Sequence, residues 1–201
     1  MIPAKRFLAL GDSYTIGEAV EEHDRWPVKF VAMLAERGIA FEVPQIIATT
    51  GWTTDELSAA IDRENPQGPF DLVSLLIGVN NQYRGYSLEN YRIEFEALLK
   101  RAIAFAGGDT TKTVVISIPD WGATPFAADR DRALIAKEID AYNASNREIS
   151  ERYKVSYIDI TPHSRLALHD SSMTASDTLH PSSLVYAHWK DLIADWYVKN
   201  P

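Results

Sequence analysis

The segment Leu72-Val73-Ser74-Leu75-Leu76-Ile77-Gly78 is apolar almost without interruption. Further along the chain, Val114-Val115-Ile116-Ser117-Ile118 repeats the same pattern. A strand with one face in water would alternate apolar and polar residues, and neither segment does so. Continuous apolar runs of this length are typical of a parallel sheet that helices cover on both faces. The two segments therefore predict the α/β class.

The rest of the chain alternates between strand-like and helix-like segments, as a parallel sheet with crossover helices requires. Five strands are predicted, at residues 6–10, 41–48, 71–77, 113–118 and 155–160. Five helices are predicted, at residues 26–37, 54–63, 88–106, 131–153 and 184–198. Thr53 and Glu56 match a capping box, and Ser87 is an N-cap candidate. The pattern predicts one three-layer α/β/α domain over residues 1–201.

Composition excludes several classes of protein. The 201 residues contain no cysteine, so disulfides and thiolate metal sites are impossible. Asp and Glu number 28 against 20 Lys and Arg, and the net charge of -8 disfavours nucleic acid as a partner. No segment approaches the ~20 apolar residues that cross a bilayer, so no membrane insertion is expected. The N-terminus shows no signal peptide pattern, which favours a cytoplasmic location, although a signal removed beforehand leaves the compartment open.

Four loops carry residues that could take part in catalysis. Right-handed crossovers place every strand-to-helix loop at one edge of the sheet, where ligands of such folds bind. Gly11-Asp12-Ser13 follows the first strand, Gly51 the second, and Asn80 the third. Taken alone, a serine, a glycine or an asparagine in such a loop is ordinary cap or turn chemistry.

Asp177 and His180 complete the set near the C-terminus, three residues apart. A carboxylate that accepts from one imidazole nitrogen fixes the tautomer and leaves the other nitrogen free to take a proton from a serine hydroxyl. Together the four loops supply a nucleophile, Ser13, and a base with its orienting acid. They also supply three oxyanion donors: the amides of Ser13 and Gly51 and the side chain of Asn80.

This ordered set resembles the SGNH (GDSL-type) hydrolases, whose name-giving positions match Ser13, Gly51, Asn80 and His180 in chain order. The resemblance implies a flavodoxin-like five-stranded parallel sheet and hydrolysis of esters or acyl groups. It also implies Ser13 as nucleophile, His180 as base and Asp177 as the acid. Members of the family often have Asp after the asparagine of the third loop, where this chain has Asn81. A neutral amide can still accept and donate hydrogen bonds there.

Two other functions compete for the same residues. A flavodoxin-like binding or signalling module would share the fold without hydrolysing anything. It would be expected to carry a phospho-acceptor Asp or a glycine-rich phosphate loop, and neither is present. A metal hydrolase would need a ligand pattern that His163 and His169 do not form with nearby acids. We therefore expect an enzyme without metal or cofactor, and the GxSxG motif of α/β-hydrolases is also missing.

The substrate is expected to be a small-molecule acyl ester. Trp52, Tyr83 and Trp121 stand beside the site loops and are candidates to line an acyl or sugar pocket, with Phe126 as a fourth. Arg84 is expected to pair with a nearby acid. Short loops leave little room for a lid and favour short-chain acyl groups, as in an esterase or a carbohydrate deacetylase. The acyl acceptor and the oligomeric state stay open.

An acidic stretch follows the predicted nucleophile, formed by Glu18, Glu21, Glu22 and Asp24. It is expected to be a solvated loop. If it borders the site, it should disfavour strongly anionic substrates.

Overall fold

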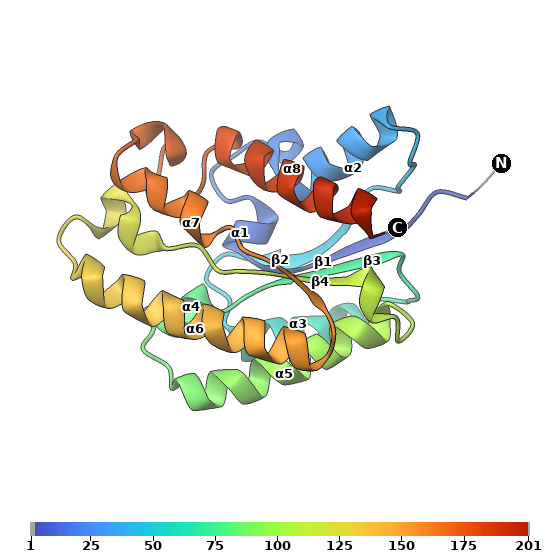
Figure 1. Ribbon diagram of the computed structural model, residues 1–201, viewed down its shortest axis with the longest axis horizontal. Helices are drawn as coiled ribbons and strands as arrows, with labels where there is room; N and C mark the ends of the chain where they lie inside the picture. The colour runs from blue at the N-terminus through green and yellow to red at the C-terminus, as the bar shows by residue number, and fades with distance from the viewer. Residues whose placement is uncertain (1–2, 201) are drawn as a thin grey trace.

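Five parallel strands form the centre of the computed structural model, which describes residues 3–200 (Figure 1). Their order is β2-β1-β3-β4-β5. In chain order the strands are β1 (Phe7–Asp12), β2 (Gln45–Thr49), β3 (Leu72–Leu76), β4 (Thr113–Ile116) and β5 (Ser156–Ile158). Leu10 pairs with Ile47 on one side and with Leu75 on the other. The predicted parallel sheet of the flavodoxin-like class is confirmed.

Helices cover both faces of this sheet. In Figure 1, α2 (Trp26–Glu36) and α8 (Ser183–Lys199) pack together above it. Below it lie α3 (Thr54–Glu64), α5 (Leu88–Phe105) and α6 (Arg132–Arg152), of which α5 contacts both of the others. No helix within residues 3–200 is both long and apolar enough to cross a membrane.

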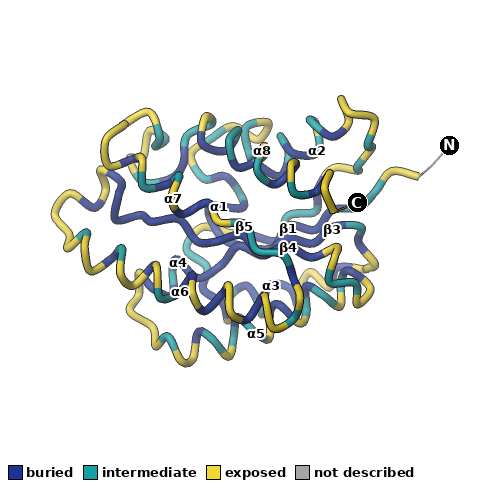
Figure 2. Tube along the Cα trace, viewed as in Figure 1, coloured by how far each residue is buried: buried dark blue, intermediate teal, exposed yellow. Residues whose placement is uncertain are grey.

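Burial follows the position of each strand in the sheet. Every residue of β1, β3 and β4 is buried, and these strands run through the dark centre of Figure 2. The edge strands β2 and β5 are only partly buried. Trp26 of α2 and Trp189 of α8 are among the largest fully buried side chains. Continuous apolar sequence therefore marks the inner strands, as expected for a sheet covered on both faces.

The predicted strand over 41–48 begins too early, because β2 starts only at Gln45. Pro44 precedes that start and has no N–H to donate to a neighbouring strand. Phe41 forms a single bridge to Lys5, and Val43 is 87% exposed. The predicted strand over 155–160 likewise shortens to β5.

Three short helices have no counterpart in the predictions: α1 (Ser13–Ile16), α4 (Val79–Tyr83) and α7 (Thr161–Ser164). Each has four or five residues, too few to show a helical period. The capping box at α3 forms as predicted, with the N–H of Thr53 donating to Glu56 at 2.9 Å. Ser87 caps α5 as predicted.

Candidate active site

Ser13 is the first residue of α1 and follows β1 directly. Asp12 caps the helix, because its Oδ1 accepts from the N–H of Tyr14 at 3.0 Å. Gly17 ends the helix after one turn in the left-handed conformation, with φ +73°. The result is a tight strand-to-helix exit that holds Ser13, 3% exposed, at the carboxyl end of an inner strand.

Asp177 and His180 form a tight pair in the loop before α8. His180 Nδ1 lies 2.5 Å from Asp177 Oδ2. The second oxygen, Oδ1, accepts from the backbone N–H groups of Leu179 and His180 at 3.0 and 2.9 Å. Burial acts to raise the pKa of Asp177, but the hydrogen bonds from the His180 ring and from the two backbone amides outweigh it and lower the pKa. Asp177 is therefore a carboxylate that holds one nitrogen of the imidazole.

Tyr14 brings the serine segment and the histidine segment together. Its ring packs against the imidazole of His180 with 5.2 Å between the centroids. Within residues 3–200, no hydrogen bond joins the hydroxyl of Ser13 to the His180 ring. Catalytic hydrogen bonds are often long in the absence of substrate and tighten only in its complex.

Gly51 adopts φ +86°, a conformation that favours glycine. Its carbonyl accepts from the guanidinium of Arg84 at 2.6 Å. Within the described chain its N–H has no acceptor, so the amide is available to a ligand. Arg84 also lies 3.3 Å from Glu56, as its predicted pairing with an acid requires. The contact with Tyr86 does most to raise the pKa of Arg84, and Glu56 raises it further.

Asn80 and Asn81 follow each other on α4 and differ in role. The Nδ2 of Asn80 donates to the carbonyl of Trp52 at 2.9 Å, which leaves its second N–H for another acceptor. Asn81 is fully buried; it accepts from the N–H of Thr54 at 3.1 Å and donates to the Thr54 hydroxyl at 2.7 Å. The amide at this position thus both accepts and donates, as the sequence suggested.

A cleft of about 170 Å³ opens beside Asn80 and His180. Of the three aromatic candidates for substrate binding, Tyr83 and Trp121 line the cleft, whereas Trp52 is not among the lining residues and packs against the core. The Trp121 ring meets Tyr83 edge-on, with 5.1 Å between the centroids. Besides these, the cleft is lined by Tyr14, Val79, Phe126 and Leu179. Tyr14, Val79 and Leu179 were missed, because only the packing of distant loops brings them to the cleft.

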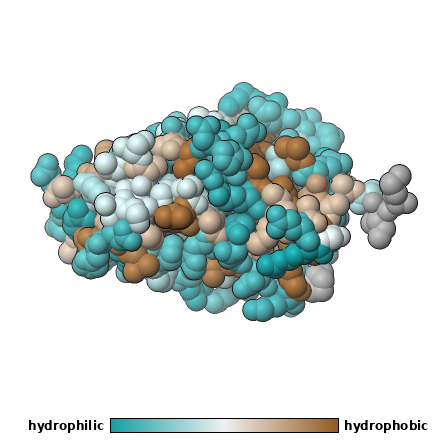
Figure 3. Space-filling view, turned by 90° about the horizontal axis from the view of Figure 1, so that it is seen from above, coloured by the Kyte–Doolittle hydropathy of each residue, from teal (hydrophilic) through white to brown (hydrophobic). Residues whose placement is uncertain are grey.

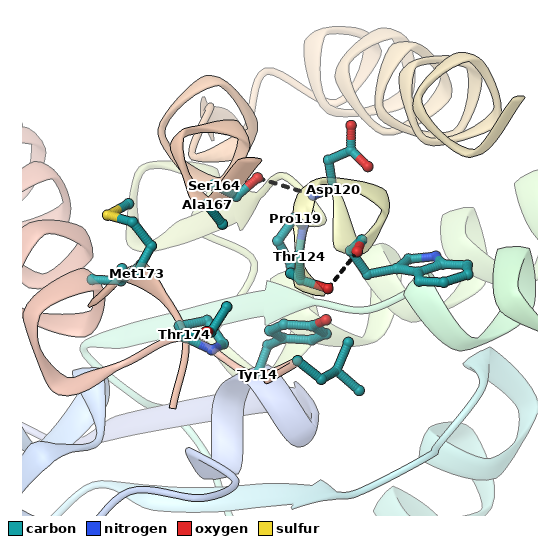
Figure 4. A pocket seen from close by; sticks show the side chains of 12 residues that line it. Tyr14, Pro119, Asp120, Thr124, Ser164, Ala167, Met173 and Thr174 are labelled. Carbon is teal, nitrogen blue, oxygen red and sulfur yellow. Dashed lines mark hydrogen bonds between the residues drawn. The ribbon is translucent and has the colours of Figure 1, made fainter. Parts of the chain in front are cut away.

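A second, smaller cavity adjoins the cleft and shares Tyr14, Trp121 and Leu179 with it. Figure 4 shows the side chains that line this cavity. Its walls are tied by hydrogen bonds from the N–H of Asp120 to Ser164 and from Thr124 to the carbonyl of Trp121. About 20 Å³ is room for a single water molecule, so an acyl group does not fit there.

The two histidines considered as metal ligands, His163 and His169, are not among the residues that line the cleft, and His169 is exposed. His163 stacks on His188 with 3.8 Å between the ring centroids. Burial, and then the neighbouring His188, lower the pKa of His163. Over residues 3–200 no group of three or more His, Asp or Glu side chains is arranged to hold a metal ion.

Solved structures with this fold include several esterases. The psychrotrophic esterase EstA from Pseudoalteromonas sp. has 17% identity and a TM-score of 0.70, with 97% of each chain covered. The lipase/acylhydrolase from Enterococcus faecalis has 21% identity and a TM-score of 0.71, covering 95% of this chain and 94% of that one. The acetylxylan esterase Axe2 from Geobacillus stearothermophilus has 16% identity and a TM-score of 0.69, covering 98% and 93%. At these identities the likeness shows the fold.

No curated protein sequence matches the chain. A family match is nevertheless clear, because residues 9–188 fit the GDSL-like Lipase/Acylhydrolase family. That span includes all four loops of the site, from Ser13 to His180. The chain therefore belongs to the GDSL-like lipase/acylhydrolase family and is a carboxylic ester hydrolase.

Proposed function

We propose that the protein cleaves carboxylic esters in two steps through an acyl-enzyme on Ser13. His180 takes the proton of the Ser13 hydroxyl as that oxygen attacks the carbonyl carbon, and then passes the proton to the leaving alcohol. Water next attacks the acyl-enzyme with His180 as base, and His180 passes that proton to the oxygen of Ser13 as the acid is released. The observation that carries the proposal is the hydrogen-bonded pair of Asp177 and His180, whose imidazole packs against Tyr14, the residue after Ser13.

Asp177 sets the tautomer of the base. A carboxylate accepts but does not donate, so the Nδ1 of His180 carries the proton in this pair. The Nε2 is then the nitrogen that accepts from Ser13. The negative charge of Asp177 also stabilises the imidazolium that forms during attack.

Three donors are proposed to hold the oxyanion of the tetrahedral intermediate: the backbone N–H groups of Ser13 and Gly51 and the Nδ2 of Asn80. The free amide of Gly51 and the second N–H of Asn80 support this role. Such donors act strongly because the fold orients them before charge develops.

Short-chain acyl esters are the proposed substrates. The cleft of about 170 Å³ is close in size to the ~150 Å³ cavity that holds benzene in another protein, so it suits a compact apolar group. The Axe2 enzyme, whose fold this chain shares, is an acetylxylan esterase, which keeps carbohydrate deacetylation among the proposed activities.

The first experiment compares hydrolysis of p-nitrophenyl acetate, butyrate and octanoate by the wild type, Ser13→Ala and Ser171→Ala. Ser171 is exposed and lies outside the cleft, so its variant controls for loss of a hydroxyl. We expect activity to vanish only in Ser13→Ala and to decline toward octanoate. Equal rates for wild type and Ser13→Ala would reject the mechanism. The absence of any rate would favour a non-catalytic binding module.

A covalent probe tests the acyl-enzyme separately. A fluorophosphonate should add one phosphonyl group to the wild type at Ser13 and none to Ser13→Ala, as mass spectrometry of the labelled peptide would reveal. Activity should persist after dialysis against EDTA. Labelling of another serine would reject Ser13 as the nucleophile.

A further inference from the structure

Trp121 forms the inner wall of the cleft and is 5% exposed. Its ring stands edge-on to Tyr83 and to Phe126, with centroid distances of 5.1 and 6.1 Å. Those two neighbours are 48% and 43% exposed, so neither can fix the indole by burial. What holds Trp121 in place decides the width of the cleft.

A chain of two hydrogen bonds reaches the indole from behind. The Nε1–H of Trp121 donates to the Oε1 of Gln82 at 2.7 Å. The Nε2 of Gln82 in turn donates to the Oε2 of Glu138 at 2.7 Å. Gln82 is buried on α4, while Glu138 is an exposed residue of α6.

The chemistry of the two partners leaves one orientation for the Gln82 amide. An indole N–H only donates, and a carboxylate only accepts. The amide oxygen must therefore face Trp121 and the amide nitrogen must face Glu138. Since both ends of Gln82 are occupied, the side chain cannot turn without leaving a buried polar group unpaired, which is costly.

We propose that Gln82, anchored by Glu138, is a positioning residue that fixes Trp121 and thereby sets the size of the apolar ester group that the cleft accepts. This proposal rests on the proposed function, because it concerns the ester bound beside Asn80 and His180. The group it predicts is compact and apolar, since the cleft is small and mostly aromatic or aliphatic. Gln82 itself is absent from the residues that line the cleft, so it acts through Trp121.

The test compares kcat and KM of the wild type, Gln82→Leu and Gln67→Leu. Gln67 is an exposed glutamine between α3 and β3, and its variant controls for the loss of an amide. One series varies the acyl chain of p-nitrophenyl esters, and a second varies the alcohol of acetate esters, so that the half of the ester in the cleft is identified. Circular dichroism and thermal unfolding confirm that each variant folds.

Release of the indole should widen the cleft. We expect Gln82→Leu to raise the ratio of kcat/KM for the largest over the smallest ester about tenfold in one series, the lower end of what a pocket contact to a methylene contributes. The change should lie mainly in KM, and Gln67→Leu should leave the ratio unchanged. Glu138→Gln keeps an acceptor and should retain the wild-type preference, whereas Glu138→Ala should shift it in the direction of Gln82→Leu.

A second variant shows whether Gln82 acts through the indole. Trp121→Phe keeps an aromatic wall but has no N–H, so adding Gln82→Leu to it should cause no further change in preference. Additive effects of the two substitutions would overturn the proposal, as would an unchanged preference or an equal loss on every ester in Gln82→Leu. If Gln82→Leu does not fold, Gln82→Met takes its place with the same criteria. A wild type without esterase activity would instead overturn the proposed function, and this inference with it.

Discussion

At the scale of single residues, Asp12 is notable because its carboxyl group is buried directly beside Ser13. Its carboxyl is fully buried, and within the described residues Oδ2 has no hydrogen-bond partner. Burial raises the pKa of Asp12 from 3.8 to about 7, although the N–H groups of Tyr14 and of Asp12 itself act to lower it. The fold therefore holds a carboxyl that titrates near neutral pH directly beside Ser13.

This shift makes stability depend on pH in a defined direction. Between about pH 4 and pH 7 the folded protein holds a proton on Asp12 that the unfolded chain has released, so the free energy of unfolding falls as the pH rises. The full shift corresponds to an upper limit of roughly 4 kcal/mol. Asp12→Asn keeps the helix cap and has no proton to lose. We expect it to gain stability relative to wild type as the pH rises from 5 to 8.

Urea unfolding at several pH values measures this difference. Asp170→Asn is the control, because Asp170 is an exposed cap whose pKa is lowered, chiefly by hydrogen bonds from Ser172. Its carboxylate stabilises the fold above its unfolded pKa of 3.8 and loses that effect only at lower pH, so the difference in stability between wild type and Asp170→Asn should stay constant from pH 5 to 8. A constant difference between wild type and Asp12→Asn from pH 5 to 8 would contradict the prediction.

Asn80 is the one proposed oxyanion donor that substitution can remove without touching the backbone. Loss of one such donor typically lowers kcat by 10²- to 10³-fold, so Asn80→Ala should fall within that range while KM changes little. Asn90→Ala, on the exposed surface of α5, is the control. Steady-state kinetics on p-nitrophenyl acetate measure kcat and KM of both variants. A decrease in kcat of less than a few-fold in Asn80→Ala would remove Asn80 from the mechanism.

At the scale of elements, Asn81 joins α4 to α3. Its amide bonds both the N–H and the hydroxyl of Thr54, and that hydroxyl also donates to Glu94 on α5. Three helices thus meet at one buried threonine. This contact fixes α4, and with it the position of the neighbouring Asn80.

Asn81→Asp introduces the residue more usual in the family and places a second carboxylate at Thr54, next to Glu94. Two carboxylates then compete for one hydroxyl proton, and the pKa of one of them must rise. A raised pKa in the folded state favours folding at low pH and is lost as the pH increases. We therefore expect Asn81→Asp to be less stable than wild type at pH 7 and to approach it at pH 5. Chemical denaturation at the two pH values tests this, and equal stability at pH 7 would refute it.

Sequence patterns predicted the elements that span several turns or several buried residues. The inner strands β1, β3 and β4 follow from continuous apolar runs, and the five long helices from their period. Patterns failed where a single residue overrides propensity, as Pro44 does before β2. The short helices α1 and α4 escaped because one turn has no period, although they carry Ser13 and Asn80.

The site was partly predictable for a topological reason. Parallel strands bring the loops after them to one edge, so Ser13, Gly51 and Asn80 could be grouped without coordinates. The residues that line the cleft could not be predicted in this way, since Tyr14 and Leu179 meet there only through the packing of loops that are far apart in sequence. Trp52, predicted as a wall, turns toward the core for the same reason.

At the scale of the whole molecule, charge is the property most relevant to substrate choice. Apolar and hydrophilic residues are interspersed on the face shown in Figure 3, so no single apolar band dominates it. The net charge is -8, and part of it lies close to the site. Glu18 follows α1 and accepts a hydrogen bond from Thr50, the residue before Gly51. The nearby cation Arg84 is already paired with Glu56.

An anionic ester should therefore be turned over more slowly than a neutral ester of similar length, and salt should reduce the difference. The Debye length falls from about 30 Å at 0.01 M to below 10 Å above 0.1 M, which screens the repulsion between exposed charges. We expect kcat/KM for p-nitrophenyl hemisuccinate to rise several-fold between 0.01 and 0.5 M NaCl, while that for p-nitrophenyl butyrate stays constant.

Two variants separate the local charge from the total charge. Glu18→Gln removes a carboxylate beside Gly51 and retains an oxygen that can accept from Thr50. Glu64→Gln makes the same change in net charge at the end of α3, at the sheet edge opposite the site. At 0.01 M NaCl only Glu18→Gln should raise the rate on the anionic ester, because the repulsion it removes acts close to Gly51. Equal effects of the two variants would assign the discrimination to the overall charge of -8 and leave Glu18 without a special role.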